Sequence, residues 1–574
     1  MERRQALTLP RRSLSLHTER LGPLPLINHF LDRLGLTPLL QRFVPTGDRR
    51  VRLPFAHGLG VLLRSVLVER EPIYRQQETV ASFAPQAFGL SAKLGAHVGD
   101  DAIGRALDHL FDADRGTLLT EVVVTATQRF GLSFEELHND STSIRFCGQY
   151  HQARGRSIRG RRAPFITHGY SKDHRADLKQ LLFILTTSRD GGVPIQFRCE
   201  AGNASDARTH EATWDALCRA VGRHDFLYVA DSKLCNRDAM DHLARRGGRF
   251  VCVMPRSRLE DREFRAWLQT HEPSWELVRD RQYPRRRQGP RDRWWTWRAA
   301  LPSCEGWPVV WVRSSLLALR QERTRREHLA RATQELEALA ARLARPRPQL
   351  RARTEIAERV QKILRKYHVR RYLTVQLTQA DEHRFRQAAP GRPGPQTRYL
   401  RKTRRFWRLS TKLAEEAIAY DHKSDGMYPL LTNDAKLTNA QVLEAHKRQP
   451  TIEKRFEQTK SVLELAPVLL KNEGRVEALF FIYFLALLVQ ALIERELRAA
   501  MQRADIEKLP LYPEERACAH PTAEQVFRLF SQTARHVVRH RGRDLHTFHP
   551  ELTPLQLEVL RLLRVPATAY RPRS

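Results

Sequence analysis

The sequence predicts an α/β protein in which a mixed β-sheet with flanking helices is interrupted by a β-rich insertion and preceded by an all-helical domain. Three observations predict this fold class. Up to about Phe130, apolar residues recur every three or four positions, a period typical of amphipathic helices. After Phe130, apolar runs of strand length alternate with helical segments. Between residues 257 and 425, clustered tryptophans and a long charged stretch mark a change of composition that indicates an inserted domain.

The first 130 residues are expected to form two pieces. Residues 1–20 are polar and rich in arginine, so we expect a basic arm. Residues 21–130 are expected to form a helical N-terminal domain, which either recognises DNA or serves as a scaffold for dimerisation, because no helix-turn-helix pattern stands out. The helical segments in this domain are expected at 24–34, 59–68, 100–111 and 118–130.

The first part of the predicted sheet domain spans residues 131–256. An Asp-Gly-Gly turn between two apolar runs predicts a β-hairpin, and two helices separate the later strands. This alternation predicts a mixed sheet covered by helices. The strands are expected at 134–144, 179–188, 193–200, 226–232 and 250–255, and the helices at 209–219 and 236–245.

The stretch from 257 to 425 is predicted to be the insertion domain. Aromatic strands are expected at 291–298 and 307–312. Leucines at coiled-coil-like spacing in residues 315–345 predict a long charged helix, and a second helical stretch reaches about Lys366 after a Pro-Arg-Pro break. Together the two stretches predict a helical hairpin.

The segments after the insertion are expected to complete the sheet domain and then to form a C-terminal tail. Residues 389–395 are rich in proline and glycine and are expected to be a linker. An apolar strand at 427–433 resumes the sheet, so 426–500 is expected to be the second part of that domain. The run 478–493 is apolar apart from one glutamine; it is too short and too interrupted for a membrane span and predicts a buried helix. Residues 501–574 are expected to form a helical basic tail.

The charge of the chain indicates a polyanionic partner. Against 64 acidic residues there are 98 Lys and Arg, a net charge of +34. Because neutralising phosphates releases condensed counterions, nucleic acid is the first candidate and an anionic membrane surface the second. The basic residues are spread along the chain and no signal segment opens it, so no membrane is expected. Seven scattered cysteines, none in a CxxC pattern, indicate neither disulfides nor a zinc site, and favour the reducing cytoplasm.

Three carboxylates are candidates for chemistry. Asp140 and Asp231 each close a predicted buried strand, and Glu453 lies on a predicted helix. Burying a lone carboxylate is costly, whereas carboxylates at strand ends can converge on a cation that offsets their repulsion. Mg²⁺ suits such a set, and two ions about 3.5 to 4 Å apart would activate an attacking oxygen and stabilise a leaving one at phosphorus. Charge and acids together indicate phosphodiester chemistry.

Each acid also has a structural interpretation. Asp231 is followed by Ser and Lys and could cap the helix after it. Glu453, taken alone, would be a solvated residue on a helix surface. Asp173 and Asp177 compete with Asp140 for the first position and are interpreted as solvated loop charges or helix caps.

Six short motifs follow one another along the chain. They are LHNDSTS around Asp140, GYSKDHRADLKQ at 169–180, GNASD at 202–206, YVADSK around Asp231, DGMYPLLTN at 425–433 and IEKRFEQTKS at 452–461. None is specific alone, but the set in this order resembles the DDE transposases of bacterial insertion sequences over about residues 21–497. The branch that looks most similar has an RNase H-like catalytic domain interrupted by a β-rich insertion between the second Asp and the Glu.

The resemblance implies a function. Asp140, Asp231 and Glu453 would be the catalytic triad and the metal ligands, with Mg²⁺ as cofactor and Mn²⁺ as its substitute. The protein would bind double-stranded DNA at inverted-repeat ends, cleave it to free 3′-OH groups and transfer these to target DNA. The need to pair two ends, together with the charged stretch 315–345, predicts a homodimer in the DNA complex.

The family signature around the Glu has a Tyr and an Arg before it and a Lys after it. Lys460 matches the Lys and is expected to contact phosphate; at 3.6 residues per turn it would share a helix face with Glu453 and Phe456. The sequence departs from the signature at its other two positions. His446 and Gln449 stand there, and Arg448 beside Gln449 is a further candidate DNA contact.

Further DNA contacts are expected outside this signature. His174 and Arg175 are predicted to contact phosphate or to brace the site. Trp295, Trp297 and Arg298 lie in a cluster of tryptophans and arginines. They either stack an unpaired base and grip phosphates, or pack the core of the insertion.

Two other functions stay open on the sequence. One is a metal-dependent nuclease of the same fold that cuts but does not join. The other is a DNA-binding regulator, such as a catalytically inactive relative. All three acids are present, and an inactive relative has no physical reason to keep them.

Overall fold

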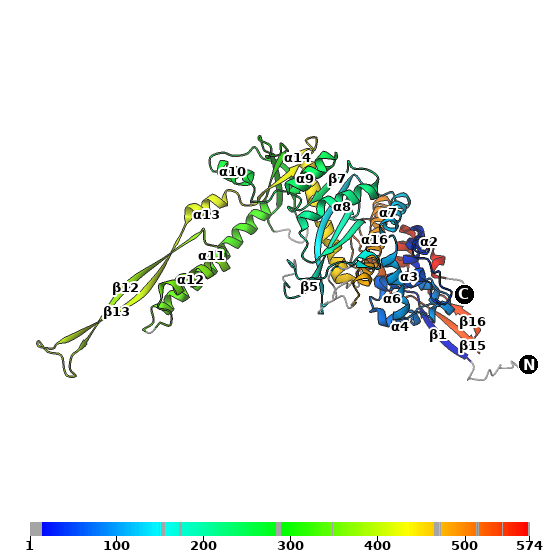
Figure 1. Cartoon of the computed structure of the whole chain (residues 1–574), viewed down its shortest axis with the longest axis horizontal. Coiled ribbons are helices and arrows are strands. Elements are labelled where there is room, and N and C mark those ends of the chain that lie inside the picture. Colours follow the sequence, from blue (N-terminus) through cyan, green and yellow to red (C-terminus); the bar gives the residue numbers. More distant parts are fainter. Residues whose placement is uncertain are drawn as a thin grey trace, which may run out of the picture. The chain divides into compact units, whose positions relative to one another are not determined.

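The computed structural model forms two compact units, Met1–Cys252 with Glu444–Ser574, and Val253–Leu443 (Figure 1). The residues that it describes are 14–148, 150, 155, 157–170, 175–282, 289–346, 348–463, 470, 472–512, 514, 516–541 and 543–571.

A mixed β-sheet runs through the first unit, as the sequence predicts. Its strands follow the order β6-β5-β2-β7-β8. The pairs β6·β5 and β5·β2 are antiparallel, whereas β2·β7 and β7·β8 are parallel. The strands are β2 (Glu136–Phe146), β5 (Lys179–Ser188), β6 (Pro194–Ala201), β7 (Leu227–Ala230) and β8 (Arg249–Val253).

Helices connect and cover these strands. Helix α8 (Asp206–Val221) precedes β7, and α9 (Arg237–Arg245) lies between β7 and β8 in the chain. Helix α16 (Glu473–Arg503) packs on β6, where its Phe484 ring stacks 5.1 Å from that of Phe197. This helix is long and apolar enough to cross a membrane, but 83% of its apolar window is buried inside the protein. The prediction of a buried helix at 478–493 is therefore confirmed.

Helices fill the predicted N-terminal stretch 21–130. Two of them, α3 and α6, pack against α16 (Figure 1), because each presents an apolar stripe at helical spacing. The α-helices are α1 (Leu24–Arg33), α2 (Leu36–Phe43), α3 (Phe55–Val68), α4 (Gln76–Ala81), α5 (Ala92–Gly95), α6 (Asp100–Asp112) and α7 (Arg115–Phe130), with 3₁₀ turns at Ile73–Arg75 and Pro85–Phe88.

The two ends of the chain form a small sheet that the sequence interpretation missed. Strand β1 (Leu14–Arg20) pairs antiparallel with β15 (Ala534–His540), which pairs with β16 (Arg543–Phe548). The predicted basic arm is therefore wrong for residues 14–20, and the predicted all-helical tail is wrong for 534–548. β1 pairs with a strand more than 500 residues away, and the Glu19–Arg535 ion pair at 2.7 Å is equally remote in sequence. The tail also contains helices α17 (Ala523–Phe530) and α18 (Pro554–Leu562).

The second unit contains four antiparallel strands in the order β14-β11-β10-β9. The Trp311 ring on β11 stacks 3.6 Å from that of Phe264 on α10 (Leu259–Trp267), so aromatic residues form the core here. The strands are β9 (Glu276–Arg281), β10 (Asp292–Arg298), β11 (Val309–Ser314) and β14 (Met427–Thr432); helix α13 spans Glu415–His422.

The predicted helical hairpin of the insertion is present. Helices α11 (Ser315–Leu343) and α12 (Arg353–Lys366) share one apolar cluster that includes Leu336 and Val360. After them come β12 (Leu373–Gln387) and β13 (Tyr399–Leu413), which pair only with each other. The predicted linker at 389–395 is instead the loop of this β-hairpin, because proline and glycine suit a tight reversal as well as a linker.

Helix α15 (Pro450–Glu457), which follows α14 (Asn439–Arg448), is held against α16 and the β5–β6 turn by a buried arginine. The guanidinium of Arg455 lies 2.9 Å from the Glu494 carboxylate on α16 and donates to the carbonyls of Gly191 and Gly192 at 2.8 and 2.9 Å. Gly192 has φ +61°, and a Cβ there would meet Thr451 Cγ2 at 2.5 Å. Only glycine allows the β5–β6 turn to approach α15 this closely.

Breaking this buried ion pair is expected to destabilise the protein strongly. Both side chains are less than 5% exposed, so Arg455→Met would leave the Glu494 carboxylate buried with only the more distant Arg498, at 3.5 Å, as a cation. We expect the free energy of unfolding in urea to fall by about 3–5 kcal/mol. The double variant Arg455→Met, Glu494→Leu should recover at least half of that loss, because no charge is then left buried. If Arg455→Met lowers the free energy of unfolding by less than about 1 kcal/mol, the ion pair does not hold α15 in place.

Candidate active site

The parallel pairing of β2 and β7 brings two of the predicted acids together. The register pairs Leu137 with Tyr228 and His138 with Val229. Two residues further along, Asp140 lies inside β2 rather than at its end as the sequence predicted, and Asp231 directly follows β7; the two strands lie about 4.8 Å apart. Both side chains are half-buried. The two aspartates therefore lie on neighbouring segments of the chain, near the carboxyl end of β7.

Local hydrogen bonds orient these two carboxylates. Asp140 Oδ1 accepts from the backbone N–H of Ser141 at 2.7 Å, and Asp231 Oδ1 accepts from that of Lys233 at 2.9 Å. Asp231 does not cap helix α9, because Asn236 does so by accepting from the N–H of Asp238. The capping interpretation of Asp231 is therefore wrong.

Tyr228 is a buried residue of β7 that senses the charges of both acids. Tyr228 is buried and hydrogen-bonded to His210, with its hydroxyl 3.1 Å from Nδ1. Burial, followed by the charges of Asp231 and Asp140, raises the pKa of Tyr228 well above its ordinary value. Two negative charges thus act on one phenol from the same region.

Glu453 lies on α15 with its side chain exposed, and the segment just before it is hydrogen-bonded to β2. Gln449 Nε2 donates to the carbonyl of Asn139 at 2.8 Å, and Gln449 Oε1 lies 3.0 Å from Nδ1 of His138. Glu453 follows Gln449 by four residues, one helical turn. The turn that carries Glu453 is therefore attached to the strand residues directly before Asp140.

A buried carboxylate extends this attachment. Glu136, 5% exposed, accepts from Arg448, whose Nη1 lies 2.8 Å from both carboxylate oxygens, and its Oε1 lies 2.9 Å from His138 Nε2. Burial alone would raise the pKa of Glu136, but the hydrogen bonds with His138 and Arg448 outweigh burial and hold that pKa below its ordinary value. A charged network thus fixes the junction of α14 and α15 on β2.

The sequence interpretation missed this network, although a signal for it exists. Glu136, His138 and Asp140 alternate along β2, so their side chains lie on one face of the sheet. Buried polar side chains need hydrogen-bond partners, so polar residues at every second position of a buried strand predict partners on the helices that cover that face. These partners, Arg448 and Gln449, are more than 300 residues away in the sequence.

The other residues of the predicted signature are placed differently. After Glu457 the helix widens into a π-helical turn, Gln458–Val462, which holds the half-buried Lys460. Because a π turn breaks the 3.6-residue spacing, the prediction that Glu453, Phe456 and Lys460 share one face is wrong. Phe456 is buried beside Phe183, whereas Glu453 is exposed. Arg448 bonds Glu136 and Glu444, and a DNA contact by it stays a prediction.

The other predicted DNA contacts have partners of their own. His174 and Asp173 lie outside the described residues, and Arg175 is exposed and donates to both oxygens of Asp177 at 2.8 and 2.7 Å. In the second unit, Trp297 stacks on Trp267 with ring centroids 5.3 Å apart.

The two remaining residues of the tryptophan cluster are also engaged. Trp295 is half-buried beneath Arg313, and Arg298 donates to Asn439 Oδ1 at 3.0 Å and to the carbonyl of Leu437. These contacts favour the packing interpretation for Trp297 and Arg298 over base stacking.

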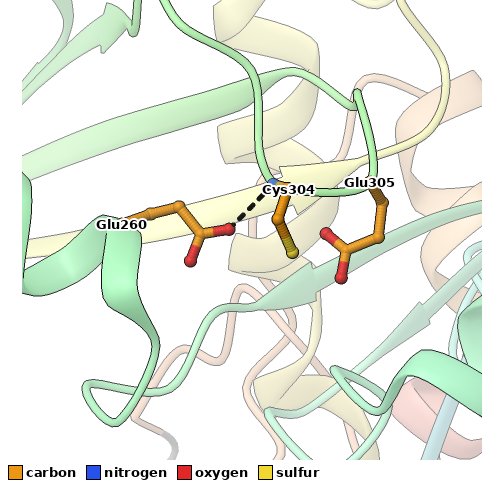
Figure 2. A group of neighbouring side chains, drawn as sticks. All are labelled: Glu260, Cys304 and Glu305. Carbon is orange, nitrogen blue, oxygen red and sulfur yellow. Dashed lines mark hydrogen bonds between the residues drawn. The ribbon is translucent and has the colours of Figure 1, made fainter.

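Another acidic cluster has the closest metal-like spacing among the described residues. Potential ligand atoms of Glu260, Cys304 and Glu305 lie within 4.8 Å of one another in the second unit (Figure 2). Arg258 already neutralises them: its Nη2 lies 2.6 Å from Glu260 Oε1, 2.7 Å from Glu305 Oε2 and 3.1 Å from the Cys304 sulfur. The hydrogen bond from Arg258 lowers the pKa of Glu260 to about 2. A guanidinium thus takes the place that a cation would need.

No family model and no curated protein matches the chain. Among solved structures it is similar to a piggyBac transposase in a synaptic complex with hairpin DNA, with a TM-score of 0.35 and 9% sequence identity. The match covers 83% of this chain and 77% of that chain. Similarity at this level shows no shared activity.

The half-buried His446 on α14 predicts a pH dependence of stability. Burial, followed by the charges of Lys447 and His138, lowers the pKa of His446 from 6.5 to about 4. Because the unfolded chain takes up this proton first, stability is lost as pH falls from 6.5 towards 4. We expect this histidine to contribute a loss of about 2 kcal/mol between pH 7 and pH 5 in urea unfolding. His446→Gln should remove that part of the slope; an unchanged slope would contradict the prediction.

Proposed function

We propose that this protein is a DDE-type DNA transposase, a polynucleotidyl transferase that cleaves the inverted-repeat ends of an insertion sequence and joins them to target DNA. The observation that carries the proposal is the parallel pairing of β2, which contains Asp140, with β7, which ends directly before Asp231. The net charge of +34 supports a polyanionic substrate, and the order of the motifs supports the transposase class. On this proposal the mixed sheet is RNase H-like.

Asp140, Asp231 and Glu453 would hold Mg²⁺, or Mn²⁺ in its place. The donor set fits, because Mg²⁺ binds protein through one or two carboxylates and keeps its other positions for water and phosphate oxygens. Asp140 and Asp231 would supply two such hard ligands from neighbouring segments, although the oxygens of the three acids do not all lie within 4.8 Å of one another. When bound, the metal would supply charge stabilisation at the phosphate and an activated attacking oxygen.

The protein's own residues have distinct tasks in this proposal. Backbone N–H groups each hold one oxygen of Asp140 and of Asp231 and so orient the two carboxylates. The Gln449 and His138 contact sets the distance between α15 and β2, and so positions Glu453 without touching the reacting atoms. Lys460, one turn beyond α15, would contact a backbone phosphate of the DNA end.

Pairing two ends requires two active sites, so we propose that a homodimer forms on DNA. Cleavage and joining would take place in the cytoplasm, on nucleoid DNA. In the second unit, Trp295, Trp297 and Arg298 are involved in packing and would support the insertion domain.

Removing any one acid is expected to abolish cleavage while leaving DNA binding intact. The variants are Asp140→Asn, Asp231→Asn and Glu453→Gln, and the substrate is an end-labelled duplex carrying the inverted repeats that flank the coding sequence, with Mg²⁺ and with EDTA. Cleavage should fall by on the order of 10³-fold or more, because residues of a catalytic set act as a unit. Duplex affinity, measured by anisotropy with EDTA, should stay within about threefold of wild type.

Neighbouring acids serve as matched controls. Glu457→Gln removes an exposed carboxylate one turn further along α15, and Asp238→Asn removes one from the first turn of α9. Both variants should cleave normally. Normal cleavage by a triad variant would remove that residue from the site. Binding without any cleavage by wild type would favour a DNA-binding regulator, and cleavage without joining of precut ends would favour a nuclease.

A further inference from the structure

The hairpin of β12 and β13 in the second unit is a long ribbon with little supporting core. Each strand has 15 residues, so the ribbon is about 50 Å long. Its base is packed, because Leu373 and Leu409 belong to the apolar cluster of α11 and α12. Figure 1 shows the ribbon continuing past the ends of these helices.

The outer half of the ribbon relies on cross-strand pairing. Beyond Asp381 and Arg405, the described contacts are pairs between the two strands and bonds from Arg404 to the carbonyls of Ala344 and Arg345. Isolated two-stranded hairpins are only marginally stable in water. A partner that covers the ribbon would therefore stabilise it.

The ribbon is strongly basic, and its charge is concentrated on one face. Residues 373–413 contain ten Lys and Arg against Asp381 and Glu382, a net charge of +8. The register pairs Glu382 with Arg404 and Arg384 with Lys402, so alternate positions share a face. The basic face is made by Arg384, Arg386, Lys402, Arg404, Arg408 and Lys412, with Glu382 as its acid.

Most cations of the basic face are free of acidic partners. Glu382 pairs with Arg384 and Arg404 at 3.0 and 3.2 Å. Within the described part of the chain, the other four, Arg386, Lys402, Arg408 and Lys412, form no ion pair, and all four are exposed. Four like charges on one face repel each other, so a polyanion bound to this face would stabilise it.

We propose that the ribbon is a DNA-binding arm that lies in the major groove of a double helix with its basic face on the phosphates. The partner rests on the function proposed above. The major groove is about 12 Å wide and admits a two-stranded ribbon. The ribbon is longer than one turn of B-DNA, about 34 Å, so its cations can reach phosphates over a full turn. Leu400, which pairs with Arg386 on the basic face and is 52% exposed near the loop, would contact base edges and sugars.

The test is the salt dependence of binding by the full-length protein. The ribbon variant Arg386→Gln, Lys402→Gln, Arg408→Gln removes three free cations of the basic face. Affinity for a 40-base-pair DNA duplex is measured by fluorescence anisotropy over a KCl series, with EDTA present. Each phosphate contact adds about 0.9 to the slope of log K against log salt, so the slope should fall by about 2 to 3.

A matched variant separates the ribbon from total charge. Arg503→Gln, Lys508→Gln, Arg528→Gln removes two arginines and one lysine that are exposed in the first unit and form no ion pair with described residues. Its slope should stay within about 1 of wild type. An equal loss in both variants would overturn the proposal, because charge anywhere would then suffice.

The remaining outcomes separate this proposal from the proposed function. If wild type binds the duplex but the ribbon variant keeps the wild-type slope, the proposal that the ribbon binds DNA is overturned, whereas the transposase proposal stands. If wild type binds no duplex, both fail. An RNA duplex of the same sequence has a deep, narrow major groove that the ribbon cannot enter. The difference in salt slope between wild type and the ribbon variant should therefore be smaller with this RNA than with DNA. An equal change would overturn the groove placement, and loss of dimer mass in light scattering with an unchanged slope would show that the ribbon binds a second copy of the chain.

Discussion

The parallel pairing of β2 with β7 is the constraint on which the candidate site depends. A strand alternates its side chains between two faces, so a slip of one residue would move Asp140 or Asp231 to the opposite side of the sheet. Antiparallel β5 holds β2 from its other edge through ten register pairs, Leu137–Ser188 to Phe146–Lys179, which exclude such a slip. Backbone pairing with β5 and β7 thus fixes the strand that carries Asp140, and β7 ends directly before Asp231.

Helix α15 is held at two points by two kinds of polar contact. Arg455 ties it to the protein interior through Glu494 and the glycine turn, and Gln449 ties its start to β2. Such networks are costly when half satisfied and rigid when complete. Here an opposite charge or hydrogen-bond partner meets each of Arg455, Glu136 and His138. The result is a helix whose exposed carboxylate, Glu453, stands on a firm base.

The sequence predicts the parts of this protein that local pattern determines. The apolar run of β7 stops at Asp231, and the leucines of α11 repeat at helical spacing, so both elements could be found from the sequence alone. Contacts between distant residues leave no such trace. The Gln449–His138 bond spans 311 positions, and the π turn at Lys460 follows ordinary helix-forming residues. The ribbon was missed because its polar strands lack the apolar alternation that marks a half-buried strand.

The pairing of β1 with β15 has a consequence for how the chain is made. A ribosome adds about 5 to 20 residues per second, so about half a minute to two minutes pass between the synthesis of Leu14 and that of His540. During that time the helices of the first 130 residues can fold, but β1 keeps an open edge. The sheet can therefore close only near the end of synthesis. A chain released from the ribosome before β15 is made would leave the edge of β1 unpaired.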